Sequence, residues 1–423
     1  MVEALGARPE TADRARLREM RGCEPVSRDN DSGTWMVYRY DDAARVLTDH
    51  AAFTSEYAEA SALVTRLLAG TDTERVAVDP AMHRELRRLV NRRFTAGAIA
   101  ALGSRVLTLT NELLDRVAGD ARIDLATDLA FPLPVRVIAE LLGVPREDMG
   151  SVLSWVDVLC GTTPPGPPLV PSPRRVTACD ARAELLAYLR EHVTRARRAA
   201  DPSADMTGEL LHAEVDGRLL DDDRVVALLG LLLLSGHLTT TSLLASVVLC
   251  LDEHPAVSDE VRAFPELLTP VIEEVLRYRT PVGRVTRRAK LDVELGGQRI
   301  LAGDQVTVVM DSVNQDERRF TAPERFDIHR RTTSRLSTGY GLPFGPGSPV
   351  ARLQTRMALE LLLWRYCEIS VERAELRTHR IGWITVPTSM PLRVRSASAV
   401  HNAEVPPLDA KGPHLSRGRR HSR

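Results

Sequence analysis

Apolar residues recur at helical spacing in five segments of this 423-residue chain, and this pattern limits the fold more than any other feature. The segments are 87–94, 99–117, 180–198, 222–250 and 267–278. Short strands are predicted at 34–38 and in the alternating run 306–310, with hairpin turns at 296–297 and 302–303. Because the helical segments far outweigh the strands, the sequence predicts a mainly α fold with small β-sheets.

One domain is predicted over residues 11–396. Residues 1–10 are expected to form a flexible N-terminus, and the polar stretch 397–423, with its basic end, is expected to be a disordered tail. Residues 163–173 hold six prolines, so no helix passes through them. We expect an extended loop there, and the sequence leaves open whether this loop is a lid or a plain connector.

Charge and cysteine content indicate a cytoplasmic protein. The formal net charge is -1, so no global field favours nucleic acid or an anionic membrane as a partner. The longest apolar run, 225–234, is too short to span a bilayer. The cysteines have no C-x-x-C spacing, which disfavours a metal cluster or a disulfide framework. They are Cys23, Cys160, Cys179, Cys250 and Cys367.

Two motifs have the spacing of a ligand site. His83 and Arg87 stand four residues apart, so both side chains share one helix face and two cations could bind a carboxylate. The alternative is a solvated surface pair. Within segment 222–250, Gly236 permits close approach of a ligand or ring, and Thr239 follows it. The alternative here is a helix kink filled by hydroxyls that bond back to the helix.

A third motif predicts a buried ion-pair cluster. Glu274 and Arg277 form a Glu-x-x-Arg pair, and Arg325 follows in the sequence Pro-Glu-Arg-Phe at 323–326. A carboxylate between two guanidiniums can be satisfied even when it is buried. Glu274 could be satisfied in this way by Arg277 and a second arginine.

In their order and spacing, these motifs resemble those of the bacterial cytochrome P-450 superfamily across nearly the whole chain. The resemblance implies the cytochrome P-450 fold, with His83, Arg87 and Arg284 in the positions that contact haem propionates. It also implies that Arg325 is the partner of Glu274 and Arg277 in a structural triad. For Arg284 the alternative is an exposed strand arginine. The resemblance also puts Leu238 and Thr239 in the oxygen-activation positions, where the family usually has an acid before the threonine.

The haem-ligating cysteine of this family is missing from the sequence. Its signature, FGxGxHxCxG, aligns without gaps to residues 338–347, which puts Gly345 at the position of the cysteine and Pro343 at that of the histidine. A second register uses Phe344 to Gly347 as the start of the signature, needs a deletion, and supplies no cysteine either. Cys367 is expected to lie inside the following helix. Without the thiolate, the push of electron density that favours O–O cleavage is lost.

The resemblance includes cysteine-less relatives that activate glycosyltransferases in actinomycete natural-product pathways. It therefore predicts a non-catalytic auxiliary protein of a glycosyltransferase, with no cofactor, rather than a working monooxygenase. The alternative is a haem-binding oxidoreductase of the family with an unusual proximal side. A small-molecule carrier that reuses the pocket is a third hypothesis.

Overall fold

The computed structural model describes residues 11–54, 96–160, 177–198, 205–215, 218–330 and 347–397. The predictions for the N-terminus at 1–10, the proline-rich loop at 163–173 and the tail after 397 lie outside them. The prediction of a single domain stays a prediction.

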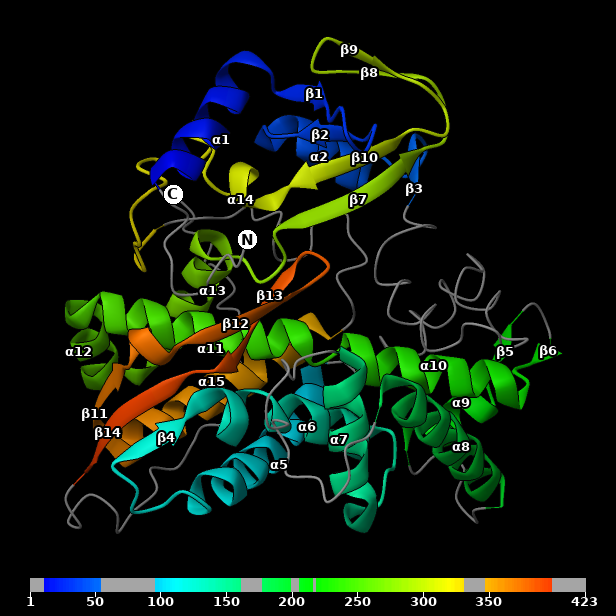
Figure 1. Ribbon diagram of the computed structural model, residues 1–423, viewed down its shortest axis with the longest axis vertical. Helices are drawn as coiled ribbons and strands as arrows, with labels where there is room; N and C mark the ends of the chain where they lie inside the picture. The colour runs from blue at the N-terminus through cyan, green and yellow to red at the C-terminus, as the bar shows by residue number, and fades with distance from the viewer. Residues whose placement is uncertain are drawn as a thin grey trace, which may run out of the picture.

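Helices form most of the described structure (Figure 1). The α-helices are α1 (Thr11–Cys23), α2 (Tyr40–Thr48), α5 (Ala96–Asp115), α6 (Pro132–Leu141), α7 (Met149–Cys160), α8 (Ala178–Arg197), α9 (Met206–Leu211), α10 (Asp222–Ser235), α11 (Leu238–Glu253), α12 (Pro255–Ala263), α13 (Leu268–Tyr278), α14 (Met310–Val313) and α15 (Ser348–Arg365). A π-helical turn, η2 (Ala126–Ala130), precedes α6, and short 3-10 turns occur at η3 (Arg146–Asp148), η4 (Pro265–Leu267) and η6 (Arg373–Glu375).

The strands form several small sheets. The largest has the order β1 (Val26–Arg28), β2 (Trp35–Val37), β10 (Gln305–Val309), β7 (Arg284–Ala289) and β3 (Phe53–Thr54). A second has the order β11 (Tyr366–Val371), β14 (Pro391–Ser396) and β4 (Arg122–Asp124). Three hairpins complete the set: β12 (Arg377–Ile381) with β13 (Ile384–Ser389), β5 (Glu214–Val215) with β6 (Arg218–Leu219), and β8 (Val293–Leu295) with β9 (Gln298–Ile300).

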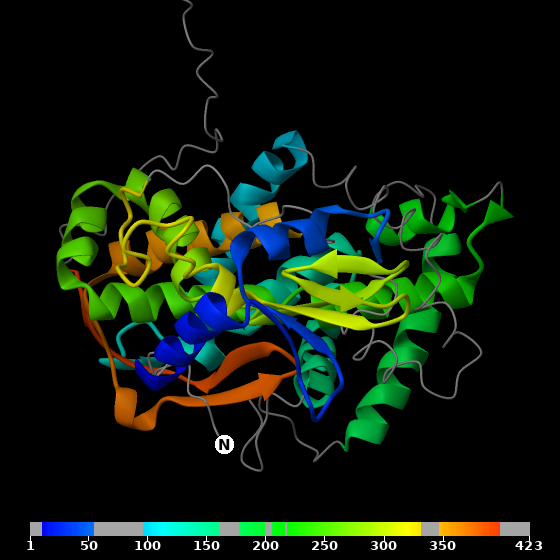
Figure 2. The same ribbon diagram turned by 90° about the horizontal axis from the view of Figure 1, so that it is seen from above.

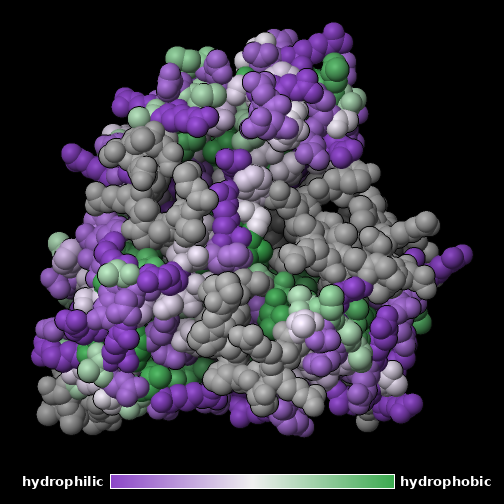
Figure 3. Space-filling view, in the orientation of Figure 1, coloured by the Kyte–Doolittle hydropathy of each residue, from purple (hydrophilic) through white to green (hydrophobic). Residues whose placement is uncertain are grey.

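Three buried apolar clusters hold these elements together. One joins α5, α11, α13 and α15, and another joins α6 to α10 with the start of α11. The third lies between the five-stranded sheet and α2. In Figures 1 and 2 the sheet and α1 form one part of the molecule, while the long helices form the other. On the face in Figure 3, hydrophobic colour is confined to small areas, as expected when the apolar residues fill the core.

The stretch Asp222–Glu253 is long and apolar enough, by length and composition, to cross a membrane, and it is the one such stretch among the described helices. However, 76% of its most apolar window is buried inside the protein. A helix that is apolar on all sides and packed on all sides belongs to a protein core. The apolar composition of this stretch is thus explained by its packing against neighbouring helices.

The predicted class is confirmed in its secondary structure: the described residues are mainly α with small sheets. Segments 99–117, 180–198 and 267–278 correspond to α5, α8 and α13 within a few residues. Segment 222–250 is not one helix, because it divides at Gly236 and His237 into α10 and α11. Segment 87–94 lies outside the described residues.

Candidate functional site

The break between α10 and α11 lies at Gly236, close to α6. A side-chain carbon added at Gly236 would lie 2.8 Å from the Leu232 carbonyl oxygen of α10 itself and 2.4 Å from Ile138 Cδ1 on α6. After the break, the Thr241 hydroxyl donates to the Ala130 carbonyl oxygen of η2 at 2.9 Å. Glycine fits here because any side chain would meet the Leu232 carbonyl and would displace the flexible end of Ile138.

His237 lies in this break and is completely buried. Its Nδ1 is 3.0 Å from the Leu233 carbonyl oxygen, so Nδ1 carries the proton and donates. Among the described residues its Nε2 has no hydrogen-bond partner, and the ring packs edge-on against Phe131 with 5.5 Å between centroids. Burial lowers the pKa of His237 to about 4, so the ring is neutral near pH 7.

The two predicted oxygen-activation positions differ in environment. Leu238 is 1% exposed and belongs to the same apolar cluster as Val386 on β13. Thr239 is half-buried. An acid at position 238 would have to be buried among apolar side chains, and this is costly without a partner. The surroundings of Leu238 are thus adapted to a hydrocarbon side chain rather than to a proton-relaying acid.

Arg284, the predicted propionate contact, lies at the start of β7 and is half-buried. Its guanidinium carbon lies 4.4 Å from the centroid of the Trp383 ring. Arg380 also lies over this ring, at 5.2 Å. Within the described residues Arg284 forms no salt bridge with a carboxylate. Arg284 is a strand arginine, as the alternative has it, but it is half-buried rather than exposed because the Trp383 indole lies against the guanidinium. Its contact with a propionate stays a prediction.

The predicted Glu274–Arg277 pair is present and almost completely buried. Arg277 Nε donates to Glu274 Oε2 at 3.0 Å, and its second terminal nitrogen donates to Oε1 at 2.6 Å. The prediction for Arg325 is wrong, because its backbone carbonyl, not its guanidinium, joins the cluster, accepting from Arg277 at 3.0 Å. Arg330 supplies the second cation, with Nε 3.3 Å from Glu274 Oε1. The loop after Pro323 turns so that Arg330 faces the carboxylate while the Arg325 side chain is exposed.

The remaining predicted haem contacts, His83, Arg87 and Gly345, lie outside the described residues. The two cysteines nearest in sequence to Gly345 are described. Cys250 is buried on α11, and burial raises the pKa of its thiol to about 12. Cys367 is exposed and lies on β11, not inside α15 as the sequence suggested, because the helix ends at Arg365. Its Sγ is 3.3 Å from the Arg395 carbonyl oxygen.

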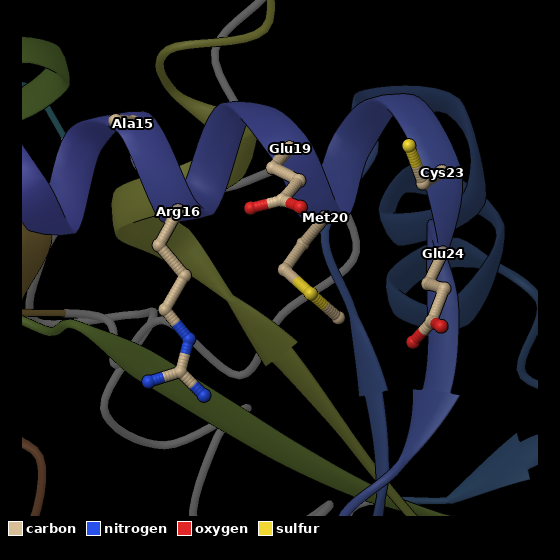
Figure 4. A pocket seen from close by; sticks show the side chains of 6 residues that line it. All are labelled: Ala15, Arg16, Glu19, Met20, Cys23 and Glu24. Carbon is tan, nitrogen blue, oxygen red and sulfur yellow. The ribbon is translucent and has the colours of Figure 1, made fainter.

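A separate hollow of about 490 Å³ lies on α1 (Figure 4). It is lined by residues of α1 and the residue after it: Ala15, Arg16, Glu19, Met20, Cys23 and Glu24. Arg16 and Met20 point from the helix toward the neighbouring strands. A mixed set of charged and apolar side chains from a single helix does not define a catalytic site. In the described part of the chain, no group of three or more His, Cys, Asp or Glu residues could hold a metal ion.

Comparisons with known proteins agree with this geometry. The cytochrome P-450 family model matches residues 266–384. The chain is 40% identical over 385 residues to the cyclomarin C epoxidase CymV of Salinispora arenicola, covering 90% of this chain and 95% of that protein. It is 37% identical over 391 residues to the erythromycin C-12 hydroxylase of Saccharopolyspora erythraea, covering 91% and 95%. A solved structure of HmtN, a post-tailoring hydroxylase of himastatin biosynthesis, has 36% identity and a TM-score of 0.77, covering 91% of this chain and 97% of that one.

The divided central helix, the buried Glu-x-x-Arg pair and these similarities define the class as a P-450 fold protein. The chain belongs to the cytochrome P-450 family. The named relatives are hydroxylases and an epoxidase, so the comparisons support the oxidoreductase alternative better than the glycosyltransferase auxiliary. The family also implies haem, and the prediction that the chain takes no cofactor therefore finds no support.

The described residues fit one end of a haem. Arg284 offers a half-buried guanidinium with no carboxylate partner there, as a propionate requires. Within the segment 266–384 that the family model matches, the sequence contains a single cysteine, Cys367, which lies on β11.

Sequence reasoning missed three residues of this region: His237, Arg330 and Trp383. His237 stands next to Gly236 inside an apolar segment, which was a usable signal for a buried polar group. Arg330 follows five residues after Arg325, and no spacing rule distinguishes the two. Trp383 is one of only four tryptophans in the chain, but its contact with Arg284 depends on tertiary structure.

Proposed function

We propose that this protein acts in the tailoring of a bacterial secondary metabolite, and that it does so without thiolate-dependent oxygen activation. The observation that carries the proposal is the absence of any cysteine between Cys250 and Cys367 in a chain that otherwise keeps the family fold. The cysteine thiolate is the ligand that pushes electron density onto haem iron. Glycine, which stands at the aligned position 345, offers no side chain to ligate a metal.

The first candidate function is a haem-binding oxidoreductase with an unusual proximal side. The comparisons favour it, because the named relatives are tailoring hydroxylases and an epoxidase. The availability of Arg284 for a propionate also favours it. When bound, haem supplies redox chemistry whose potential and reactivity depend on its axial ligand. In this chain Arg284 would bind a propionate.

The second candidate is a non-catalytic auxiliary protein of a glycosyltransferase. Two features of the sequence favour it: Gly345 replaces the cysteine, and Leu238 replaces the acid of the proton relay. The structure adds that Leu238 is packed in an apolar cluster. Such a protein would bind the folded, active transferase and thereby stabilise it. The gain in the transferase's stability would grow as the concentration of this protein rises above the dissociation constant of the complex.

Haem binding separates the two candidates. The full chain is expressed with a haem precursor, purified and examined for a Soret band, and then titrated with haemin. A stoichiometric Soret band supports the oxidoreductase. Protein that stays colourless and does not respond to haemin overturns it. The auxiliary function is tested by co-expression with the glycosyltransferase of the same gene cluster: a transferase that is equally active and stable without this chain overturns that candidate.

The cellular setting is part of the same proposal. A cytoplasmic location, without nucleic acid or membrane as a partner, is supported by the formal net charge of -1 and by the burial of the one long apolar helical stretch. Fractionation of the producing cells tests it, and recovery of the protein with the membrane pellet would overturn it.

A further inference from the structure

Trp383 lies in the turn between β12 and β13, at the tip of a hairpin. Its ring faces the guanidinium of Arg284 from a distant part of the sequence, at 4.4 Å from the ring centroid. This is well within the range at which an arginine is attracted to an aromatic face. Among the arginine–aromatic contacts of the described residues, this one has the shortest distance.

Backbone contacts fix the two residues relative to each other. The Gly283 N–H donates to the Trp383 carbonyl oxygen at 2.9 Å, and Val282 forms an antiparallel bridge with Ile384. The Gly283 carbonyl in turn accepts from Met310 N–H at 2.8 Å. A side-chain carbon at Gly283 would lie 2.7 Å from Asp311 Oδ2, so glycine allows this close approach. The hairpin tip is thereby held against the residue that precedes Arg284.

The contact with Trp383 leaves the N–H donors of the Arg284 guanidinium available to a carboxylate. A guanidinium that lies over an aromatic ring keeps its five N–H donors in its own plane, free for a carboxylate. In the described structure no carboxylate forms a salt bridge with Arg284. Among the described residues the buried indole Nε1 of Trp383 also has no hydrogen-bond partner. A half-buried guanidinium that forms no salt bridge with a described carboxylate indicates a place for an anion beside it.

We propose that Trp383 is a positioning residue that holds Arg284 ready to bind a carboxylate. The carboxylate comes from a haem propionate, or from a carboxylate-bearing ligand of the same pocket. The first source rests on the haem-binding candidate function above, whereas the second does not. Trp383 acts through Arg284: without the ring, the long arginine side chain loses its fixed orientation and pays more conformational entropy on binding.

The test compares haemin with haemin dimethyl ester, whose propionates carry no charge. Each is titrated into the purified full chain and into the variants Arg284→Lys, Trp383→Leu and Trp383→Phe. We expect the wild type to prefer haemin by roughly tenfold, as one charge-assisted hydrogen-bonded pair would give. Arg284→Lys and Trp383→Leu should lose most of this preference, and Trp383→Phe, which keeps a ring, should retain part of it.

The matched control is Trp35→Leu. The guanidinium of Arg28 lies over the Trp35 ring, 5.8 Å from its centroid. Trp35 is in the same sheet as Arg284 but far from it: Trp35 pairs with Val306 at one end of β10, and Arg284 pairs with Val309 at the other. This control should keep the full preference for haemin. Equal binding of haemin and its ester by the wild type overturns the role of Arg284. An unchanged preference in Trp383→Leu overturns the role of Trp383.

If neither porphyrin binds, the haem-binding candidate function fails. The carboxylate site at Arg284 is then tested with a different carboxylate. Octanoate is then titrated while the melting temperature is followed. A saturable rise in the wild type that is lost in Arg284→Lys and in Trp383→Leu supports a carboxylate site with another source. No change in the wild type overturns the inference.

Discussion

Arg277 donates hydrogen bonds to both carboxylate oxygens of Glu274, at 3.0 Å and 2.6 Å. The side chain of Glu274 is only 4% exposed and that of Arg277 only 1%. Removal of one partner leaves the other charged and buried. We therefore expect Arg277→Met to lower the free energy of unfolding by about 3–5 kcal/mol. Denaturant unfolding measures it. The exposed pair Glu368 and Arg395 is the control, and Arg395→Ala should cost less than about 1 kcal/mol. Similar losses in both would contradict this assignment.

Arg330 and Arg325 should differ in their effect on the same cluster. Arg330 contacts Glu274 with its side chain, whereas Arg325 contributes its backbone carbonyl. Arg330→Ala is expected to cost about 2 kcal/mol, since it removes a charge-assisted bond from a buried carboxylate. Arg325→Ala keeps the carbonyl and should stay within about 0.5 kcal/mol of the wild type. If thermal unfolding shows a larger loss of stability for Arg325→Ala than for Arg330→Ala, then Arg325 and not Arg330 completes the triad.

Leu238 tests whether the oxygen-activation site survives in the fold. Leu238→Glu places a carboxylate inside an apolar cluster, and we expect it to destabilise the protein by about 3 kcal/mol or more. Leu238→Met nearly conserves volume and should cost less than about 1.5 kcal/mol. Denaturant midpoints of the two variants measure the difference. A Leu238→Glu protein as stable as the wild type would show that a partner for the family's acid is still in place.

His237 should make stability depend on pH. Its pKa is about 4 in the folded protein and 6.5 as its ordinary value, so the unfolded chain binds the proton more readily. Its contribution to stability is complete above pH 6.5 and is lost as pH falls from 6.5 to 4. The loss amounts to about 3 kcal/mol. The variant His237→Asn keeps a donor for the Leu233 carbonyl but does not titrate. Unfolding from pH 4 to 7 should show a steeper fall for the wild type, and parallel curves would contradict the account.

Much of the fold could be predicted from the sequence because helical periodicity is a local property. Segments 180–198 and 267–278 became helices with nearly the predicted ends. The break at Gly236 depends on how closely α6 approaches, a long-range contact that periodicity does not contain. The same reason explains Arg330, since the path of the loop after Pro323 decides which arginine reaches Glu274.

The parts of the candidate site that depend only on which amino acid stands at a position could be predicted from the sequence. The absence of a cysteine near position 345 can be read directly from the sequence, as can the apolar Leu238. The stack of Trp383 on Arg284 could not be predicted, because it joins residues 99 positions apart through the bridge of Val282 with Ile384. His83 and Arg87 stay predictions.

The most direct test of the central claim is the carbon monoxide difference spectrum of the reduced protein after haem loading. The account predicts no thiolate-type shift in the wild type, because it places Gly345, which has no side chain, where the family has its cysteine. Gly345→Cys restores the thiol at the aligned position and should produce that shift, provided that haem binds. A thiolate-type shift in the wild type itself would contradict the account, since it would require a cysteine elsewhere in the chain to reach the iron.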